Sequence, residues 1–444
     1  MRRKGNMLKA GFARLDVTPP LGLPLAGHFK YRYSDGVLDS IELVALAASD
    51  GEKTVLIIAA DLAGMWEKWT TEIRELIYQQ TGVPMEHIYI QCLHQHTSVE
   101  IGYNPHLYNA YGYNRFFDSA YYDILYRKFV DVSRMAIDDL SEARMSVAEQ
   151  KTAEDISFIR RYRMKDGSIR TNPGRKNIDN IESAIGEADN TVRLVKFQRE
   201  GAKDIALVNF STHPDVIGGT KISADWPGFV RRMTETDIPN THCIFLNGVQ
   251  GDTNHFKIFE EPSKLTKYEY SAYMGRVITD VVVDIWNKTE EKEVLSVSGQ
   301  SEMTYIPTNV SQLDEVEKCR QLKRKIEDGT YTAGSMGERA DIDRVAELYN
   351  QSLFQKVAIS LITIGEVAFV GYGGEPFTEY AAEIRTAAPE RFIITTCITN
   401  SYSGYFPTKE AFTEGGYEVK SSNFTIDLVD ILQNKVKEML AKSV

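Results

Sequence analysis

Short apolar runs, each ending abruptly in a polar segment that contains glycine, recur along the whole chain. Apolar runs of about four to eight residues are typical of strands that are covered on both faces. Amphipathic helical patterns lie between these runs, as at residues 66–82 and 424–442. Strands that alternate with helices predict the α/β class, with a mixed β-sheet core flanked by helices. The apolar runs occupy residues 54–64, 88–96, 204–219, 242–255, 366–377 and 392–407.

The length of the chain and its hydrophobic content predict one large domain. The chain has 444 residues, of which 43% are hydrophobic, and this is enough for a large buried core. We expect a single domain over residues 1–444 with a helical insertion at about residues 308–356. The insertion is charged and amphipathic, which is typical of a helical hairpin on the outside of a fold. Such a hairpin is either a solvated pair of helices without a functional role or the contact of a homo-oligomer.

The net charge and the absence of long apolar runs argue against nucleic acid and membrane as partners. The formal net charge is −11, whereas nucleic-acid binding needs a basic face. No apolar run reaches the roughly 20 residues that cross a bilayer, and the basic start lacks the apolar part of a secretory signal. We therefore expect no stable membrane insertion, a cytoplasmic location and a small-molecule substrate.

Four scattered cysteines, without C-x-x-C spacing, indicate reduced core thiols: Cys92, Cys243, Cys319 and Cys397.

Polar side chains follow the ends of several expected strands. The stretch "IYIQCLHQH" ends in two histidines at positions i and i+2. In open α/β sheets, ligands bind just beyond the carboxyl ends of the strands. The residues alone leave two interpretations open, a metal or proton-transfer site and ordinary hydrogen-bonded strand ends. The polar residues beyond these strands are His94, His96, His213, Asp252, Glu375 and Tyr405.

A set of short motifs, in order and covering nearly the whole chain, resembles the neutral/alkaline ceramidase family. The resemblance begins with "AGFARLDVTPPLGLPLAG" (residues 10–27) and continues through "LHQHTS", "RRYRMKDGSIRTNPG", "FSTHPDVIGG" and "NGVQGDTN". It ends with "GGEPFTEYAAEIR" and "NSYSGYFPTKEAFTEGGYEV". The chain is similar to the short bacterial branch of the family, which lacks the C-terminal immunoglobulin-like domain.

Carried over by position, this resemblance implies a zinc site. It implies four zinc ligands, which are His94, His213, Glu375 and Tyr405. It also implies three residues on the substrate side, which are His96, Tyr417 and Arg160. Tyr402 lies three residues before Tyr405, and either tyrosine could instead be a core aromatic residue.

The implied residues suit hydrolysis by zinc. Two imidazoles and a carboxylate leave an open position on tetrahedral zinc, and zinc lowers the pKa of bound water to about 7. His96 is the expected proton relay to a leaving amine. Tyr417 and Arg160 are expected to stabilise the developing oxyanion.

One departure from the family concerns the "GDTNH" segment. Family members carry a serine where this chain has Asn254. We expect Asn254 to be a catalytic residue that donates a hydrogen bond to the developing oxyanion, although an amide cannot replace serine as a nucleophile. We expect the neighbouring Asp252, and Asp225, to hold loops or cap helices. His255 directly follows this segment and has no assigned role.

The substrate interpretation rests on the tyrosine-rich stretch at residues 99–122. Tyrosine and asparagine suit a polar, partly flat ligand better than a long acyl chain, although these residues could instead pack the loop or a subunit contact. We predict a zinc-dependent hydrolase that cleaves a linear amide of a small polar or sugar-like substrate. The alternatives are a zinc-dependent enzyme acting on a carbohydrate ester or glycosidic bond, and a catalytically inactive zinc-binding homologue.

Overall fold

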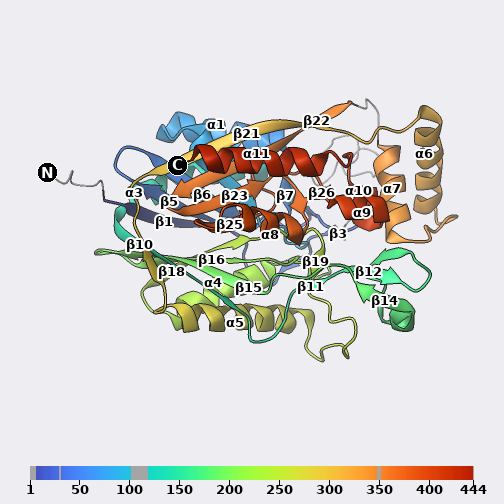
Figure 1. Cartoon of the computed structure of the whole chain (residues 1–444), viewed down its shortest axis with the longest axis horizontal. Helices are drawn as coiled ribbons and strands as arrows, with labels where there is room; N and C mark the ends of the chain where they lie inside the picture. Colours follow the sequence, from blue (N-terminus) through green and yellow to red (C-terminus); the bar gives the residue numbers. More distant parts are fainter. Residues whose placement is uncertain (1–6, 30–31, 102–118, 348–351, 444) are drawn as a thin grey trace.

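The computed structural model describes residues 7–29, 32–101, 119–347 and 352–443. These residues form a mixed α/β fold of four layers, with helices on the outside and two sheets between them (Figure 1). The predicted sheet core flanked by helices is confirmed, and the division of the core into two sheets is new. Most of the tyrosine-rich stretch lies outside the described residues.

The larger sheet is antiparallel in its middle and parallel at its two ends. Its order is β18-β16-β15-β10-β1-β5-β6-β8, with β20 also paired to β10. The parallel pairs are β16–β18 and β6–β8. The strands are β1 (Lys9–Asp16), β5 (Glu42–Ser49), β6 (Thr54–Ala60), β8 (Ile88–Cys92), β10 (Ser141–Lys151), β15 (Thr191–Arg199), β16 (Asp204–Phe210), β18 (Thr241–Asn247) and β20 (Glu290–Lys292).

The smaller sheet has the order β21-β22-β23-β25, and only β23 and β25 are parallel. Its strands are β21 (Val297–Pro307), β22 (Phe354–Ile364), β23 (Val367–Tyr372) and β25 (Phe392–Thr396). Five pairs of short strands lie outside the two main sheets: β2 (Pro24–Leu25) with β3 (Arg32–Tyr33), β4 (Gly36–Val37) with β17 (Lys221–Ile222), β7 (Gly64–Met65) with β9 (Glu100–Ile101), β11 (Phe158–Ile159) with β19 (Thr253–Asn254), and β24 (Glu375–Pro376) with β26 (Tyr405–Phe406). A further small sheet has the order β13 (Ile169–Thr171), β12 (Arg161–Met164), β14 (Ile181–Ala184).

Strand alternation explains how the sheets and helices pack. In β5, Val44 and Leu46 join the core between the two sheets, while Leu43 and Ala45 face helices on the other side. In β22, Ile362 joins the core between the sheets. The outer helices are α1 (Glu67–Thr81) and α3 (Ser119–Asp138) on one half of the large sheet, α4 (Asp225–Asp237) and α5 (Lys267–Ile285) on its other half, and α8 (Thr378–Ala387) and α11 (Leu428–Lys442) on the small sheet.

Two helices occupy the predicted insertion, α6 (Leu313–Glu327) and α7 (Met336–Ala346). They pack on each other through a small cluster that includes Val316 and Val345. They lie at one end of the molecule, where α7 also packs on α10 (Tyr417–Ser421), beside α9 (Lys409–Glu414) (Figure 1). The insertion therefore contacts the helix that begins with Tyr417.

The described residues contain no helix that is both long enough and apolar enough to cross a membrane. The four cysteines are free and buried, as the sequence predicts.

Candidate metal centre

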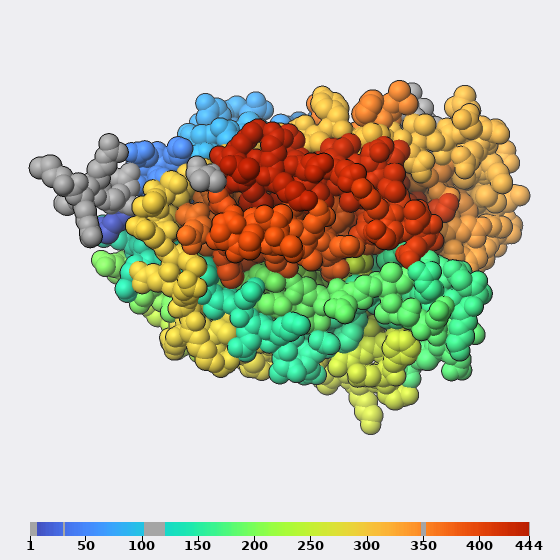
Figure 2. Space-filling model, in the orientation of Figure 1, coloured from blue at the N-terminus to red at the C-terminus, as the bar shows by residue number. Residues whose placement is uncertain are grey.

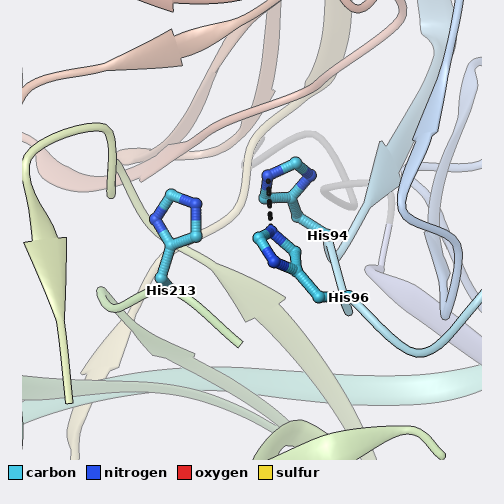
Figure 3. A group of neighbouring side chains, drawn as sticks. All are labelled: His94, His96 and His213. Carbon is cyan, nitrogen blue, oxygen red and sulfur yellow. Dashed lines mark hydrogen bonds between the residues drawn. The ribbon is translucent and has the colours of Figure 1, made fainter. Parts of the chain in front are cut away.

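The predicted metal-binding side chains converge beyond the strand ends of both sheets. His94 and His96 come from the segment after β8, and His213 faces them from the segment after β16 (Figure 3). Glu375 follows β23 of the smaller sheet. The Nε2 atoms of His94 and His213 each lie 3.4 Å from Oε2 of Glu375. Residues that are far apart in the sequence thus meet at one point.

Buried amide side chains bring the strand ends together. The Gln91 amide donates to the carbonyl of Asn247 at the end of β18, and the Asn247 N–H donates back to Oε1 of Gln91 at 3.2 Å. The same Gln91 amide donates to the carbonyl of Cys397, after β25, at 3.1 Å. Both Gln91 and Asn247 are fully buried. These bonds tie the two edge strands of the large sheet, β8 and β18, to the segment after β25 of the small sheet.

Backbone carbonyls fix the orientation of two histidines. Nδ1 of His94 lies 2.6 Å from the carbonyl oxygen of Ala63, and Nδ1 of His213 lies 3.1 Å from that of Gln250. Because a carbonyl only accepts, each Nδ1 carries a proton, and in the neutral ring Nε2 is then the nitrogen with a lone pair. A second hydrogen bond of this kind commonly orients metal-binding histidines.

The charged and polar atoms at the centre fit a divalent cation. Nε2 of His213 and Oε2 of Glu375 are buried and have no hydrogen-bond partner among the described residues. Leaving such an atom unpaired costs about 1–3 kcal/mol. The other oxygen of Glu375 accepts a hydrogen bond of 3.0 Å from the Tyr402 hydroxyl. Glu375 is thereby held with Oε2 directed at the two imidazole lone pairs, which is the donor set that zinc prefers.

The electrostatics of the centre keep its donor atoms available. Burial opposes ionisation of Glu375, but His94, His213 and Arg160 outweigh it and lower the pKa of this carboxyl to about 2. Burial and the Arg160 charge lower the pKa of His213 to about 3. At neutral pH the centre therefore offers a carboxylate and a neutral imidazole.

His96 lies within reach of the same centre. Its Nε2 is 3.4 Å from Nε2 of His94, and ligand atoms of His94, His96 and His213 all lie within 4.8 Å of one another (Figure 3). Burial and the nearby His94 hold the pKa of His96 well below its usual value. The backbone of Gly27 packs on this ring, because a Cβ atom there would lie 2.4 Å from Cγ of His96.

Arg160 and two tyrosines form the neighbouring side of the site. The Arg160 guanidinium lies 5.3 Å from the ring centre of Tyr405 and 5.8 Å from that of Tyr417. The two rings meet edge to face at 5.6 Å. Tyr405 pairs in register with Glu375 across β24 and β26. The structure thus gathers the predicted substrate-side residues Arg160 and Tyr417 beside the candidate ligand Tyr405.

Glu418 is a buried residue of this region that the sequence reasoning missed. Its carboxylate accepts hydrogen bonds from Nε of Arg160 at 2.9 Å, Nη1 of Arg161 at 3.2 Å and the Thr171 hydroxyl at 2.8 Å. A signal was present in the sequence, because two consecutive arginines that are both buried need an acid beside them, and Arg160 and Arg161 are 5% and 1% exposed. The acid itself could not be found from the sequence, since Glu418 lies 258 residues after Arg160.

The Asn254 side chain, at the end of β19, makes hydrogen bonds with neighbouring segments. Its amide nitrogen donates to Oδ1 of Asn172, and its oxygen accepts from the N–H of Phe256 at 2.9 Å. Both functions of the side chain are therefore used within the loops. His255, beside it, binds Oδ1 of Asp215 at 3.0 Å.

Two aspartates hold the segments that carry metal-binding candidates. Asp252 accepts from the N–H and the hydroxyl of Thr378, both at 2.9 Å, just after Glu375. Asp225 accepts from the N–H of Ile217 at 3.0 Å, four residues after His213. The geometry agrees with the loop-holding role expected for both residues.

Comparison with known proteins identifies the fold. The sequence matches no protein-family model and no curated protein. The structure of neutral ceramidase from Pseudomonas aeruginosa is similar with a TM-score of 0.73 at 14% sequence identity, over 98% of this chain and 74% of that one. The chain has the neutral ceramidase fold. A ceramidase complexed with C2 gives a TM-score of 0.70 at 13% identity, over 99% of this chain and 76% of that one. The ceramidase fold thus spans nearly the whole chain, as the motif resemblance implies.

Proposed function

We propose that this chain is a zinc-dependent hydrolase that cleaves a linear amide (N-acyl) bond of a small polar or sugar-like substrate. The observation that supports it most is the unpartnered Oε2 of Glu375, 3.4 Å from two imidazole nitrogens whose lone pairs face it. The ceramidase fold supports the amide as the bond that is cleaved.

His94, His213, Glu375 and Tyr405 would hold the zinc. Zinc there supplies a Lewis acid that activates water near neutral pH and polarises a carbonyl group. The backbone holds the proton of each of these two histidine rings on Nδ1, so that Nε2 is the nitrogen that faces the metal position. Tyr402 holds the remaining oxygen of the Glu375 carboxylate.

His96 is the proposed proton carrier. It is only partly buried, and its Nε2 points toward the centre while its ring rests on the Gly27 backbone. A neutral imidazole at this place accepts a proton as water is activated and then donates it to the leaving amine nitrogen. Such a positioned acid–base group contributes roughly 10²–10⁴ in rate.

Arg160 and Tyr417 are the proposed oxyanion stabilisers. The Arg160 guanidinium is anchored by Glu418 and by the carbonyl of Gly251 at 2.8 Å, so its charge has a fixed place beside the centre. Preorganised donors of this kind stabilise the negative charge that develops on the carbonyl oxygen. Because Asn254 stands where family members carry a serine and an amide is not a nucleophile, the proposed reaction uses water as its nucleophile.

A panel of matched substrates tests the proposed reaction. N-acetyl derivatives of small polar amines and of amino sugars would be compared with the corresponding esters and glycosides, with zinc-loaded protein. Release of free amine by the parent, and its loss in Glu375→Gln, would support the proposal. Cleavage of the esters or glycosides alone would favour the carbohydrate alternative. Zinc binding without any turnover would favour an inactive homologue.

A further inference from the structure

A cavity of about 680 Å³ is lined by none of the three clustered histidines His94, His96 and His213. This volume falls within the range of small-molecule sites. One wall is the segment at residues 255–265, which projects from the lower edge of the molecule in Figure 2. The opposite wall includes Tyr270 and Tyr273 of α5. None of the proposed zinc ligands lines this cavity.

The walls of the cavity are fixed by local structure. A capping box between Thr266 and Glu269 sets the first turn of α5. Tyr270 and Tyr273 are three residues apart and so share one face of this helix, with ring centres 5.5 Å apart. The Tyr270 hydroxyl donates to the carbonyl of His255 at 3.4 Å, which joins the helix to the opposite wall.

The interior of the cavity is mainly apolar and aromatic. Tyr162, Ile258 and Val216 line it together with the two tyrosines of α5. At the wall, Phe256 and Leu265 keep 49% and 46% of their surface exposed, although both are large apolar residues. A contiguous apolar lining is typical of small-molecule sites. The chemistry of these walls fits an apolar chain or an aromatic ring.

Among the described residues that line the cavity, one cation has no ion pair with an acidic side chain. Arg175 pairs with Glu261 at 2.7 Å, and Lys257 lies 3.7 Å from Glu260. Lys267, at the start of α5, has no carboxylate within 4.0 Å among the residues that the structure describes. A ligand with an acidic group would supply the missing charge.

We propose that this cavity is a second ligand site, which binds the apolar or aromatic body of a small anionic amphiphile with its acid group beside Lys267. The site goes beyond the proposed hydrolase reaction and does not depend on it. Its wall is nevertheless connected to the metal centre, because His255 binds Asp215, two residues after His213.

Two fluorescent probes of similar shape test this proposal. Anilinonaphthalene sulfonate is anionic, whereas N-phenylnaphthylamine is neutral, and both brighten in apolar surroundings. Titrations would use the full-length, zinc-loaded protein and the variants Leu265→Asp and Lys267→Gln. Leu295→Asp is the matched control, because Leu295 is 74% exposed and does not line the cavity. Thermal melting of each variant would verify that it is folded.

We expect both probes to bind the parent saturably. Leu265→Asp should weaken both probes, and Leu295→Asp should leave both unchanged. Lys267→Gln should weaken the sulfonate roughly tenfold, since it removes a charge-assisted contact, and should leave the neutral probe unchanged. Absence of saturable binding, or equal binding by the parent and Leu265→Asp, would overturn the site. An equal effect of Lys267→Gln on both probes would overturn the anionic part of the proposal. Since binding is the readout, the result holds whether or not the chain hydrolyses an amide.

Discussion

Glu375 and Tyr405 are register partners in the short parallel pair formed by β24 and β26. Side chains of register partners on neighbouring strands leave the sheet on the same side. The backbone therefore sets a carboxylate beside a phenol before any side-chain contact is considered. Gly374 permits this approach, because a Cβ atom there would lie 2.3 Å from the Phe406 ring.

The close approach of Gly251 to Glu375 gives a first prediction. A Cβ atom on Gly251 would lie 2.3 Å from the carbonyl oxygen of Glu375, so Gly251→Ala must displace backbone at a proposed ligand. We expect zinc affinity to fall roughly 10- to 100-fold, as it does when the surroundings of a ligand are disturbed. Competition with a chelating dye measures this. Gly334→Ala is the control, since only the flexible Glu338 side chain lies near it. Equal affinity in both variants would contradict the account.

Substitution of His96 distinguishes two possible sets of zinc ligands. If the zinc ligands are His94, His213, Glu375 and Tyr405, His96→Ala retains zinc but loses roughly 10²–10⁴ in rate. His94→Ala, by contrast, should lose the metal. Zinc content and turnover measured on the same samples separate the two effects. An empty site in His96→Ala would show that the three histidines, whose ligand atoms lie within 4.8 Å, form the metal site instead.

The buried ion pair between Arg231 and Asp61 gives a prediction about stability. Arg231 binds both oxygens of Asp61, and these side chains are 1% and 0% exposed. Asp61 also accepts from Gln95, which lies between His94 and His96, at 2.7 Å. Removing one partner leaves a buried charge unpaired, so Arg231→Ala should lower the free energy of unfolding by about 3–5 kcal/mol.

Urea denaturation measures the effect of Arg231→Ala. The control is Lys68→Ala, which breaks an exposed pair with Glu72 at 4.0 Å and should change stability by less than about 1 kcal/mol. Similar effects of the two substitutions would mean that the buried pair does not stabilise this part of the fold.

The raised pKa of the Asp252 carboxyl predicts that the stability of the fold depends on pH. Burial raises the pKa of its carboxyl from 3.8 to about 6, although Thr378 donates to it. Because the folded state holds this proton more tightly, the unfolded state ionises first as pH rises from 3.8. The contribution of Asp252 to stability is therefore lost between pH 3.8 and about 6, and stays lost above that range.

Asp252→Asn keeps the shape of the side chain and removes this titration. Urea denaturation of metal-free protein at several pH values should show a smaller loss of stability between pH 4 and 7 in the variant, by roughly 2–3 kcal/mol. Parallel curves for parent and variant would contradict a raised pKa at this position.

The sequence was most informative where strands end. His94, His213 and Glu375 each follow an apolar run, and parallel strand ends bring such residues to one edge of a sheet. The same reasoning could not separate the core into two sheets. Continuous apolar runs show that both faces of a strand are covered, but not whether a helix or another sheet covers them.

Polar contacts between distant residues could not be predicted from the sequence. Tyr402 and Tyr405 are the same residue type three positions apart, so the sequence does not tell their roles apart. The fold shows that Tyr402 donates a hydrogen bond to Glu375 while Tyr405 lies beside Arg160. The bonds that join Gln91 to Asn247, or Arg160 to Glu418, connect positions more than a hundred residues apart. No local pattern specifies such pairs.

Metal content per chain tests the central claim most directly. Untagged protein would be supplied with zinc, dialysed and measured by mass spectrometry of its metals, beside a His94→Ala/His213→Ala double variant. The account predicts about one zinc in the parent, as in a mononuclear catalytic site, and none in the variant. A parent without zinc, or a double variant that holds as much as the parent, would contradict a metal centre at these histidines.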